Sequence, residues 1–558
     1  MATRVVTVND ILEGHVGLDL ECFDRIYLNG WVPNLQVSGQ VVGFLTAHLG
    51  FPIPSPAILE RIGLRFRGTV AEFAAANDIP VVRFAKGERK LEVMRPHLDR
   101  LIGQGRCGVA AIGVAQEFQR VFTGTTYHSE PDGGGVPRFG YHKADRRVSA
   151  YYFYVVDEVF GPAFVKVCAY FPYPLKIWLN GHEYAKRAAT AAGIGFTALD
   201  NGFATCEDPA GLQRLCDGLG PQAIRGFCER WWARLPLPLT AADRAGGYWW
   251  DIAMRQVEVS RTIVFAAPRH ARGFFEALCT DNLDIGRPEQ MQLVFGRRVR
   301  TPPPHGYRTR LLRAGDEVSL NAHFGHSRVK SYLKCGRAFR IETVVNDTGD
   351  LGVARRIEHL PEIWVKARDV NRRMVDAFRV GQGCVLASPA FERAARPTLE
   401  EGRRAPALRF GDPRVMALVG ALCAGLHVVA GFTNRSLRAR VATLLGMPYS
   451  MSQMSYDLRR LRMKGLITRL PHSNTYVLTP DGQRVAIFYT KLHNRLLRPL
   501  AAANDPPAPL PLRQALRVIE RHVADYITEA RMAARSCGGA CGRSVAISGR
   551  STRLWTLV

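Results

Sequence analysis

The sequence predicts a multidomain α+β protein, with a mixed central sheet region followed by a helical C-terminal domain that carries a short hairpin. The chain has 558 residues, more than one ordinary core holds, so three or four domains are expected. Strand-like alternation and helical periodicity both occur before residue 400. Between residues 412 and 500, three apolar helical stretches precede two short strands and a last helix.

Stretches rich in glycine and proline set the expected domain boundaries. The clearest are the loop "HSEPDGGGVPRFGYHK", the segment "TPPPHG" and the linkers that we predict at 387–413 and 501–512. The expected parts are a mixed α/β region at 1–145, a β-rich core followed by helices at 146–300, a β/α region with a hairpin at 301–400, a helical domain at 410–500, and a linker with a basic, partly disordered tail at 501–558.

The first two regions contain the clearest local patterns. A helix is expected from Pro56, a strand within 79–90, and a helix or a long strand over 107–122. Alternating residues and turns such as "FPYP" predict the next strands, and Asn180 fits the N-cap of the helix that follows them. The strands are predicted at 148–156, 163–170 and 175–179, and later helices at 208–234 and 247–280; the sequence shows no internal repeat.

Charge is the strongest signal in the composition. Lysine and arginine number 75 against 49 acidic residues, which gives a net charge of +26. Such a chain attracts polyanions, so DNA, as a duplex or as a single strand, is the first expected partner and RNA an alternative. The 12 cysteines form no CxxC pair, the N-terminus has no signal-peptide core, and no apolar run is long enough to span a membrane. A cytoplasmic location without membrane attachment is therefore expected.

The C-terminal domain follows the order helix, helix, helix, hairpin, helix. Its third helix, "SMSQMSYDLRRLRMKGLI", has Met454, Leu458 and Leu461 at helical spacing, so this stripe is expected to pack inward. The opposite face is then expected to present polar and cationic side chains that can reach bases and phosphates in a DNA groove. These candidates are Gln453, Tyr456, Arg459, Arg460 and Lys464.

The motifs "LRRLRMKGLI" and "YVLTPDGQRVA" resemble bacterial winged helix-turn-helix DNA-binding domains, over about 90 residues. The resemblance implies a winged-helix fold whose third helix docks on duplex DNA. A winged helix that binds another protein is the alternative. The blocks "AYFPYPLKIWLNGHEYAKR", "RIETVVND" and "GFTNRSLRA" also resemble an uncharacterised family of large bacterial proteins, which implies no activity.

The stretch "HSRVKSYLKCGRAFRIETVVND" predicts a hairpin with a three-residue loop, Cys335–Gly336–Arg337. Because side chains alternate along a strand, one face is expected to be apolar and the other polar. The polar face would carry Lys330, Tyr332, Lys334, Arg340 and Glu342.

Three interpretations of this polar face compete. It is a solvated face with cross-strand ion pairs, a nucleic-acid groove in which Lys330, Lys334 and Arg340 hold phosphates, or a catalytic site. In the groove and the catalytic site, Glu342 binds a divalent ion, Mg²⁺ or Mn²⁺, or orients Arg340, and Tyr332 stacks on a base or attacks a phosphate. The pattern "K.Y.K…R.E" resembles a strand pair of plasmid and phage rolling-circle replication initiators. Their usual histidine pair is missing.

The segment "NGHEYAKR" adds His182 and Glu183 at a strand-to-helix corner as candidate catalytic residues. Lys186 stands where a zinc protease has its second histidine, so that chemistry is excluded. Glu117 is an acid in an apolar setting, for which a partner or a task is expected. Phosphate-binding and dinucleotide-binding glycine motifs are absent from the sequence, so no nucleotide or nicotinamide cofactor is expected.

These observations favour a DNA-binding protein of mobile-element or replication type, with metal-dependent strand processing, as a nuclease, as its activity. The first alternative is a non-enzymatic winged-helix transcriptional regulator. The second is an RNA-binding protein that uses the same basic surface.

Overall fold

The computed structural model describes most of the chain, which forms two compact units, one from residues 10–277 and 291–372 and the other mainly from 373–558. Among the described helices, none is both long enough and apolar enough to cross a membrane. The predicted boundary at 301–306 and nearly all of the predicted tail lie outside the described residues, which are 14–127, 138–282, 291–295, 308–314, 317–380, 389–400, 402–423, 431–471 and 473–493, with isolated positions at 12, 427 and between 510 and 525.

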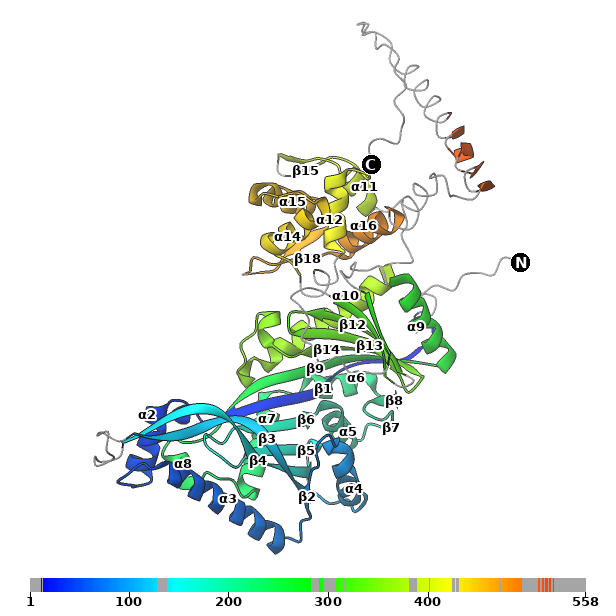
Figure 1. Cartoon of the computed structure of the whole chain (residues 1–558). Coiled ribbons are helices and arrows are strands. Elements are labelled where there is room, and N and C mark those ends of the chain that lie inside the picture. Colours follow the sequence, from blue (N-terminus) through cyan, green and yellow to red (C-terminus); the bar gives the residue numbers. More distant parts are fainter. Residues whose placement is uncertain are drawn as a thin grey trace. The chain divides into compact units, whose positions relative to one another are not determined.

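A 12-stranded mixed sheet organises the first unit, with β1 (Val16–Trp31) and β9 (Asp251–Phe265) side by side in its middle (Figure 1). Strands from all three regions expected before residue 400 hydrogen-bond within this one sheet. The other strands are β2 (Val81–Arg83), β3 (Gly108–Tyr127), β4 (Arg138–Asp157), β5 (Gly161–Cys168), β6 (Leu175–Asn180), β10 (Met291–Phe295), β11 (Arg308–Ala314), β12 (Glu317–Phe324), β13 (Ser327–Lys334) and β14 (Ala338–Val345).

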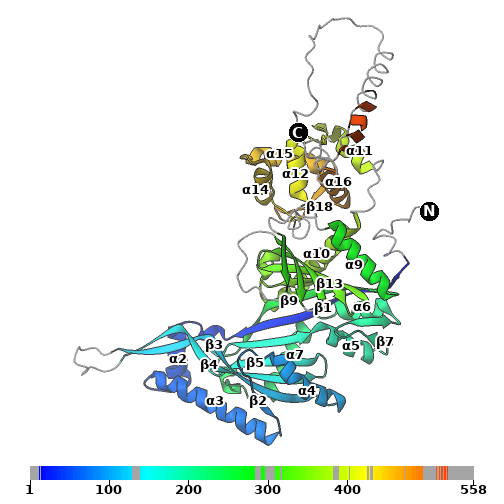
Figure 2. The same ribbon diagram turned by 45° about the vertical axis from the view of Figure 1, so that its right-hand side comes forward.

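The sheet consists of two halves with the same topology. The order is β1-β6-β5-β4-β3-β2 in one half and β9-β14-β13-β12-β11-β10 in the other. In each half the outermost pair, β2 with β3 or β10 with β11, is parallel, and the remaining pairs are antiparallel. The two views of Figures 1 and 2 show the halves continuing one into the other through β1 and β9. The expectation that the chain has no repeat is therefore wrong at the level of topology.

The β1–β9 seam contains three register shifts, and the two bulges nearest its middle are placed symmetrically. Between the pairs Tyr27–Gln256 and Arg25–Glu258 the register is regular and is centred on Ile26 and Val257. Just beyond this segment, Asp24 in β1 and Arg255 in β9 are each an extra residue without a partner in the register of this pair. A bulge changes where its side chain points. The two halves therefore meet around an approximate two-fold axis.

Helices cover both faces of the sheet. One face packs on α3 (Pro56–Ala76), α7 (Pro221–Arg234) and α10 (Leu360–Val380) in the largest apolar core. The other face contacts α4 (Lys90–Gly103) through one apolar cluster, and contacts a second cluster formed by α5, α6 and β8. The remaining elements are α2 (Ser38–Gly43), α5 (Gly181–Ala191), β7 (Phe196–Ala198), β8 (Phe203–Cys206), α6 (Pro209–Asp217), α8 (Ala241–Ala245), α9 (Pro268–Asn282) and the short turns η1 (Pro33–Leu35), η2 (Phe44–His48), η3 (Thr348–Leu351) and η4 (Ile357–His359).

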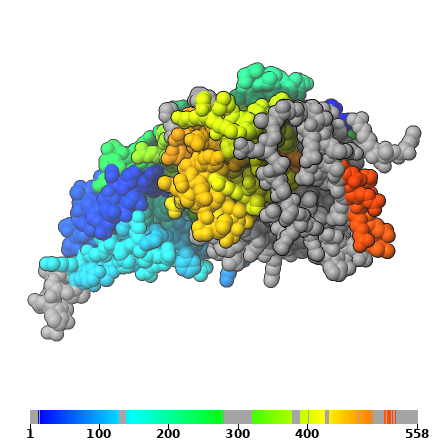
Figure 3. All heavy atoms as spheres, turned by 90° about the horizontal axis from the view of Figure 1, so that it is seen from above, coloured from blue at the N-terminus to red at the C-terminus, as the bar shows by residue number. Residues whose placement is uncertain are grey.

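The long strands β3 and β4 extend past the other strands and pack on the segment around α2 and α3. Lys143 Nζ donates to Gln36 Oε1 over 3.1 Å, and the Tyr141 hydroxyl donates to the Pro54 carbonyl over 2.5 Å. Figure 3 shows this arrangement as cyan atoms beside blue ones. These contacts support the outer end of the β3–β4 strand pair.

The local sequence patterns succeed where the strand is unambiguous. The strands predicted at 148–156 and 175–179 lie in β4 and β6, and most of the strand predicted at 163–170 lies in β5, while 107–122 falls in the strand β3. Asn180 caps α5, because its Oδ1 accepts from the amides of His182 and Glu183. The predicted loop is wrong at residues 138–143, which belong to β4; residues 128–137 lie outside the described part.

The helix predicted over 247–280 is wrong in its first half. Residues 251–265 form β9, and only 268–282 are helical, as α9. The run "VEVSRTIVF" is rich in β-branched residues, which favour strands. Pairing with both β1 and β14 then fixes this segment in the centre of the sheet.

The second unit contains the elements predicted for residues 410–500 in the predicted order; that they form a winged helix stays a prediction. Asp412 and Thr433 are the N-caps of α12 and α14, and Gly446 has the positive φ of 68° that suits a helix end. The linker predicted at 387–413 is wrong for α11 (Pro389–Ala395), β15 (Thr398–Glu400) and β16 (Arg403–Ala405). The later elements are α12 (Pro413–Leu422), α14 (Asn434–Leu445), α15 (Met451–Met463), β17 (Ile467–Arg469), β18 (Tyr476–Leu478) and α16 (Pro480–Lys491).

We predict that Gly181→Ala destabilises the first unit, because a Cβ at this position would lie 2.2 Å from the Phe23 carbonyl oxygen. The expected loss is about 1–3 kcal/mol in the free energy of unfolding, measured with denaturant. Gly68→Ala in α3 is the matched control. Nothing lies within 4 Å of its added Cβ. That variant should gain up to about 1 kcal/mol from helix propensity. Equal stabilities of the two variants would contradict the close packing of α5 on β1.

Candidate metal and nucleic-acid site

The hairpin β13–β14 has the predicted register. Lys330 opposes Glu342, Tyr332 opposes Arg340, and Lys334 opposes Ala338. Cys335 and Gly336 have φ values of 48° and 64° in the loop, so the glycine has the expected left-handed conformation. The five polar residues therefore share one face of the sheet, and the expected apolar partners of this hairpin lie on the other.

The polar face is covered rather than solvated, so the interpretation as a solvated sheet face is wrong. Arg340 is fully buried and Glu342 is 4% exposed. The cover comes from α5 and from the turn between β7 and β8. Arg340 donates to the Asn201 carbonyl over 2.7 Å, to His182 Nε2 over 3.1 Å and to Thr262 Oγ1 over 2.9 Å. A buried cation with this many partners acts as a fixed charge within the site.

Two further acids join Glu342 at this place. Asp24 from β1 and Glu258 from β9 are both buried, and one carboxylate oxygen of each of the three acids lies within 4.8 Å of the others. Sequence patterns missed both. Asp24 stands in an apolar strand whose bulge turns its side chain into the cluster, and Glu258 lies in the strand that was predicted as a helix. The acidic cluster is defined here as Asp24, Glu258 and Glu342.

Burial and charge set the protonation of the acidic cluster. Burial, together with the neighbouring Asp24 carboxylate, raises the pKa of Glu342 to about 8. Burial would also raise the pKa of Asp24, but the Arg340 charge and a hydrogen bond with Glu342 outweigh it and hold that pKa below its ordinary value. Burial raises the pKa of Glu258 as well. Glu342 therefore carries a proton that it shares with Asp24 at neutral pH.

Tyr332 and Lys330 flank the acidic cluster on β13. The Tyr332 hydroxyl donates to Glu342 Oε1 over 2.6 Å, and the Lys330 ammonium lies 3.8 Å from the centre of the Tyr332 ring. Burial and the Glu342 carboxylate raise the pKa of Tyr332 well above its ordinary value. A phenol held in its neutral form is a weak nucleophile, so the geometry favours Tyr332 as a hydrogen-bond donor that orients Glu342.

The other candidates of this region take different positions. His182 Nε2 lies 3.2 Å from Ser260 Oγ, and burial together with the Arg340 charge lowers the pKa of His182 well below its ordinary value. This histidine is therefore neutral and positions Arg340. The ammonium of Lys334 donates to Asp200 Oδ2 over 3.1 Å. Glu183 pairs with Lys186 along α5 and is not a member of the acidic cluster.

The donor set of the acidic cluster fits a divalent cation. Carboxylate oxygens bind Mg²⁺ or Ca²⁺ at about 2.0–2.6 Å, so oxygens on opposite sides of one ion lie about 4–5 Å apart. The 4.8 Å spread of Asp24, Glu258 and Glu342 is within that range. The proton between Asp24 and Glu342 stands where a cation would otherwise balance the charge, which links cation binding to loss of that proton.

Helix α15 in the second unit presents some of the residues predicted to contact DNA. Gln453, Tyr456 and Arg459 are exposed. The prediction that Arg460 and Lys464 lie on this exposed face is wrong, because both are buried. Arg460 donates to the carbonyls of Pro406 and Ala407. Lys464 donates to the carbonyls of Arg393 and Arg396, each over 2.8 Å. They bind the segment before α12 instead.

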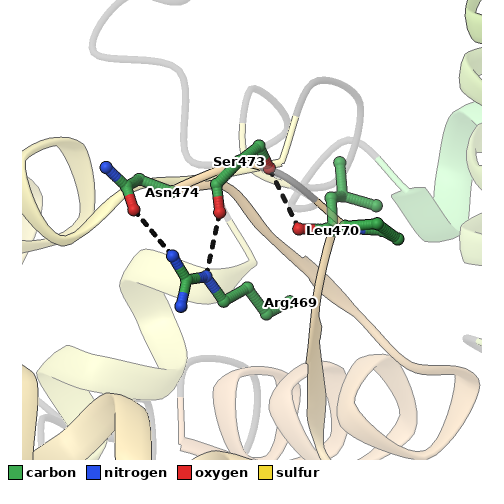
Figure 4. A pocket seen from close by; sticks show the side chains of 5 residues that line it. Arg469, Leu470, Ser473 and Asn474 are labelled. Atoms are coloured by element: carbon green, nitrogen blue, oxygen red, sulfur yellow. Dashed lines mark hydrogen bonds between the residues drawn. The ribbon is translucent and has the colours of Figure 1, made fainter.

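In the turn between β17 and β18, the Arg469 side chain bonds to other residues of the same turn, as Figure 4 shows. Arg469 Nε donates to the Ser473 carbonyl over 2.9 Å, and Nη2 donates to Asn474 Oδ1 over 2.8 Å. Ser473 Oγ in turn donates to the Leu470 carbonyl over 3.2 Å. This turn therefore offers a surface of backbone and amide groups more than a free charge.

Comparison of the chain with protein-family models, with curated proteins and with solved structures gives no match in any of the three. The function therefore has to be inferred from the chemistry of the acidic cluster and its surroundings.

We predict that Glu342→Gln removes a pH-dependent loss of stability. Since the pKa of Glu342 is raised to about 8 in the folded state, the unfolded state releases this proton first, and wild-type stability falls between about pH 5 and pH 8. Glutamine cannot lose that proton. Relative to wild type, the variant should therefore melt about 2–4 °C higher at pH 8.5, and the difference should shrink towards pH 5 in thermal scans. A difference that does not change with pH would contradict the raised pKa.

Proposed function

We propose that this protein binds DNA and cleaves or nicks it with a divalent metal ion, Mg²⁺ or Mn²⁺, held by Asp24, Glu258 and Glu342. A role in a mobile element or in replication is the biological setting that fits this activity. The observation that supports the proposal is the convergence of three buried carboxylates from separate strands of the sheet, in a chain with a net charge of +26. Burying acids together is costly unless a cation or a proton compensates for it.

The chemistry proposed is hydrolysis of a phosphodiester. A bound divalent cation supplies Lewis-acid activation of the phosphate and lowers the pKa of a water molecule. Hydrolysis would form a bond between a water oxygen and phosphorus and break the bond from phosphorus to one sugar oxygen. The water would lose a proton to solvent or to a carboxylate, and the leaving sugar oxygen would take up a proton from solvent. The protein's own groups hold the geometry: Tyr332 orients Glu342, and His182 orients Arg340.

Among the cations of the β13–β14 hairpin, Lys330 is the one best placed to bind a phosphate. It is partly exposed, whereas Arg340 is buried among protein partners and Lys334 is paired with Asp200. Lys330 would therefore hold a substrate phosphate beside the acidic cluster, and Arg340 would balance the charge of Asp24, which lies 3.8 Å from it.

We predict that the wild-type protein nicks supercoiled DNA in the presence of Mn²⁺ or Mg²⁺ and that Asp24→Asn and Glu342→Gln each lower the rate by at least about 100-fold. Loss of one carboxylate weakens the metal site without changing the size of the side chain. Conversion of supercoiled to open circular DNA on agarose gels measures the rate.

Glu183→Gln is the matched control, since Glu183 lies on α5 outside the acidic cluster and should keep full activity. Absence of nicking by the wild type with either metal would reject the proposal. Cleavage of RNA but not DNA would favour the RNA-binding alternative.

A non-enzymatic DNA-binding regulator is the second candidate, and the exposed residues of α15 favour it. Under both candidates we infer that the elements from α12 to α16 form a winged helix that docks on duplex DNA. Gln453, Tyr456 and Arg459 are placed as a recognition helix requires.

We predict that Arg459→Ala weakens duplex binding by about 1–3 kcal/mol, because its side chain is exposed on α15, where it can reach a base or a phosphate. Filter binding or fluorescence anisotropy at fixed salt measures it. Arg460→Ala is the contrasting variant. It should lower the stability of the second unit, where its side chain donates to two carbonyls, and should change the affinity of the folded protein little. Equal affinity of wild type and Arg459→Ala would argue against docking through α15.

A further inference from the structure

A second group of polar and aromatic side chains lies on the same face of the sheet as the acidic cluster, in the other half. Tyr27 on β1 opposes Trp178 on β6, and Lys176 on β6 opposes Lys166 on β5. Paired residues of antiparallel strands point to the same side. Tyr27 follows Arg25 by two residues, and Arg25 opposes Glu258, so this face is continuous with the acidic cluster.

The approximate two-fold axis relates the two groups residue by residue. Asp24 and Arg255 are the two bulge residues. Glu258 and Tyr27 each follow their strand's bulge by three positions, and each belongs to a pair that borders the regular segment of the seam. Glu342 opposes Ser260, which lies five positions after the bulge residue Arg255. Lys176 opposes Asn29, which lies five positions after the bulge residue Asp24. Each acid of the cluster therefore has a cationic or aromatic counterpart in the other half.

The aromatic residues of this second group form a ring platform. The rings of Trp178 and Phe164 stack with centres 5.9 Å apart and planes 9° from parallel. Tyr27 meets Phe164 edge-on, at 6.0 Å, and the Arg255 guanidinium lies 5.2 Å from the Tyr27 ring. Trp178 and Tyr27 are only half-buried, so part of the platform faces solvent. Half-exposed indole and phenol rings are the surfaces on which unpaired bases stack.

The charges around Lys176 are not balanced within the described residues. Burial and the charges of Lys166, Arg255 and Lys90 together lower the pKa of Lys176 to about 8. Glu117 is a carboxylate that acts on Lys176, and it already accepts from Lys90, Lys166 and the Tyr152 hydroxyl. Cations that are partly buried and crowded in this way are stabilised by an anion from outside the protein.

We propose that Tyr27, Lys176, Trp178 and Arg255 bind single-stranded DNA, with the cations on its phosphates and Trp178 stacked on an unpaired base. This inference rests on the proposed function, because it names the kind of DNA on which that activity acts. Because the second group is the two-fold counterpart of the acidic cluster on a continuous face, a strand that lies across β1 and β9 would contact both. Phosphates held by the cations in one half would then align the next phosphates with the acidic cluster in the other.

The test uses the full-length protein and a fluorescein-labelled oligothymidine of about 20 nucleotides. EDTA is present, so metal-dependent cleavage plays no part. We predict that Trp178→Ala and Lys176→Ala each weaken binding about tenfold in fluorescence anisotropy. Lys176→Arg should keep most of the affinity. The slope of log affinity against log salt should also become smaller by about 0.7 in Lys176→Ala, because one phosphate contact is lost.

Two variants on the opposite face serve as matched controls, one aromatic and one cationic. Phe118 on β3 is 74% exposed, and Lys366 on α10 pairs with Glu362. Phe118→Ala and Lys366→Ala should bind oligothymidine like the wild type. Thermal melting of all variants shows that each is folded before its affinity is compared.

The inference fails if folded Trp178→Ala and Lys176→Ala bind oligothymidine as tightly as the wild type. It also fails if Trp178→Ala and Lys176→Ala weaken the binding of duplex DNA or RNA of the same length as much as they weaken the binding of oligothymidine. These outcomes are distinct from failure of the proposed activity. If the protein never nicks DNA but Lys176→Ala loses strand binding, this inference alone is supported. If Glu342→Gln binds the strand normally but no longer nicks DNA, this inference and the proposed activity are both supported.

Discussion

The antiparallel pairing of β1 with β9 is the constraint on which the first unit depends. It joins two half-sheets of the same topology and is the place where their strands become one continuous sheet. It also brings Asp24 next to Glu258, although most of the first unit separates them in the sequence. The bulge at Asp24 then adds its carboxylate to the face that Glu342 already occupies. Both the fold and the candidate chemistry therefore depend on one seam.

The β1–β9 seam also brings buried carboxylates together, and the surrounding elements compensate for their negative charge. Three buried acids would repel each other, and Arg340, placed from β14 and held by α5 and the β7–β8 turn, supplies a fixed positive charge within 3.8 Å of Asp24 and Glu342. A neutral His182 adds no further charge there. The remaining imbalance is met by a proton on Glu342. A site that keeps a proton in place of a cation is prepared for a metal whose binding depends on pH.

The sequence was a good guide wherever the information is local. The register of β13 with β14 follows from alternation around a glycine-containing loop, and the cap at Asn180 follows from its place before a helix. Glu258 was missed because β9 is recognised as a central strand only through its partners β1 and β14. The roles of Arg460 and Lys464 were misjudged for a related reason. Helical spacing does not show that a distant segment covers part of a helix, here residues 393–407.

The length of β1 has a consequence for how the chain is made. Its 16 residues are synthesised before β9, which pairs with one of its edges and emerges from the ribosome more than 200 residues later. Until then that edge of the nascent half-sheet offers unpaired backbone groups to other chains. A fragment that stops before β9 would keep this open edge permanently, so the amino-terminal half on its own is prone to edge-to-edge aggregation. The second half-sheet thus serves the first as its edge protection.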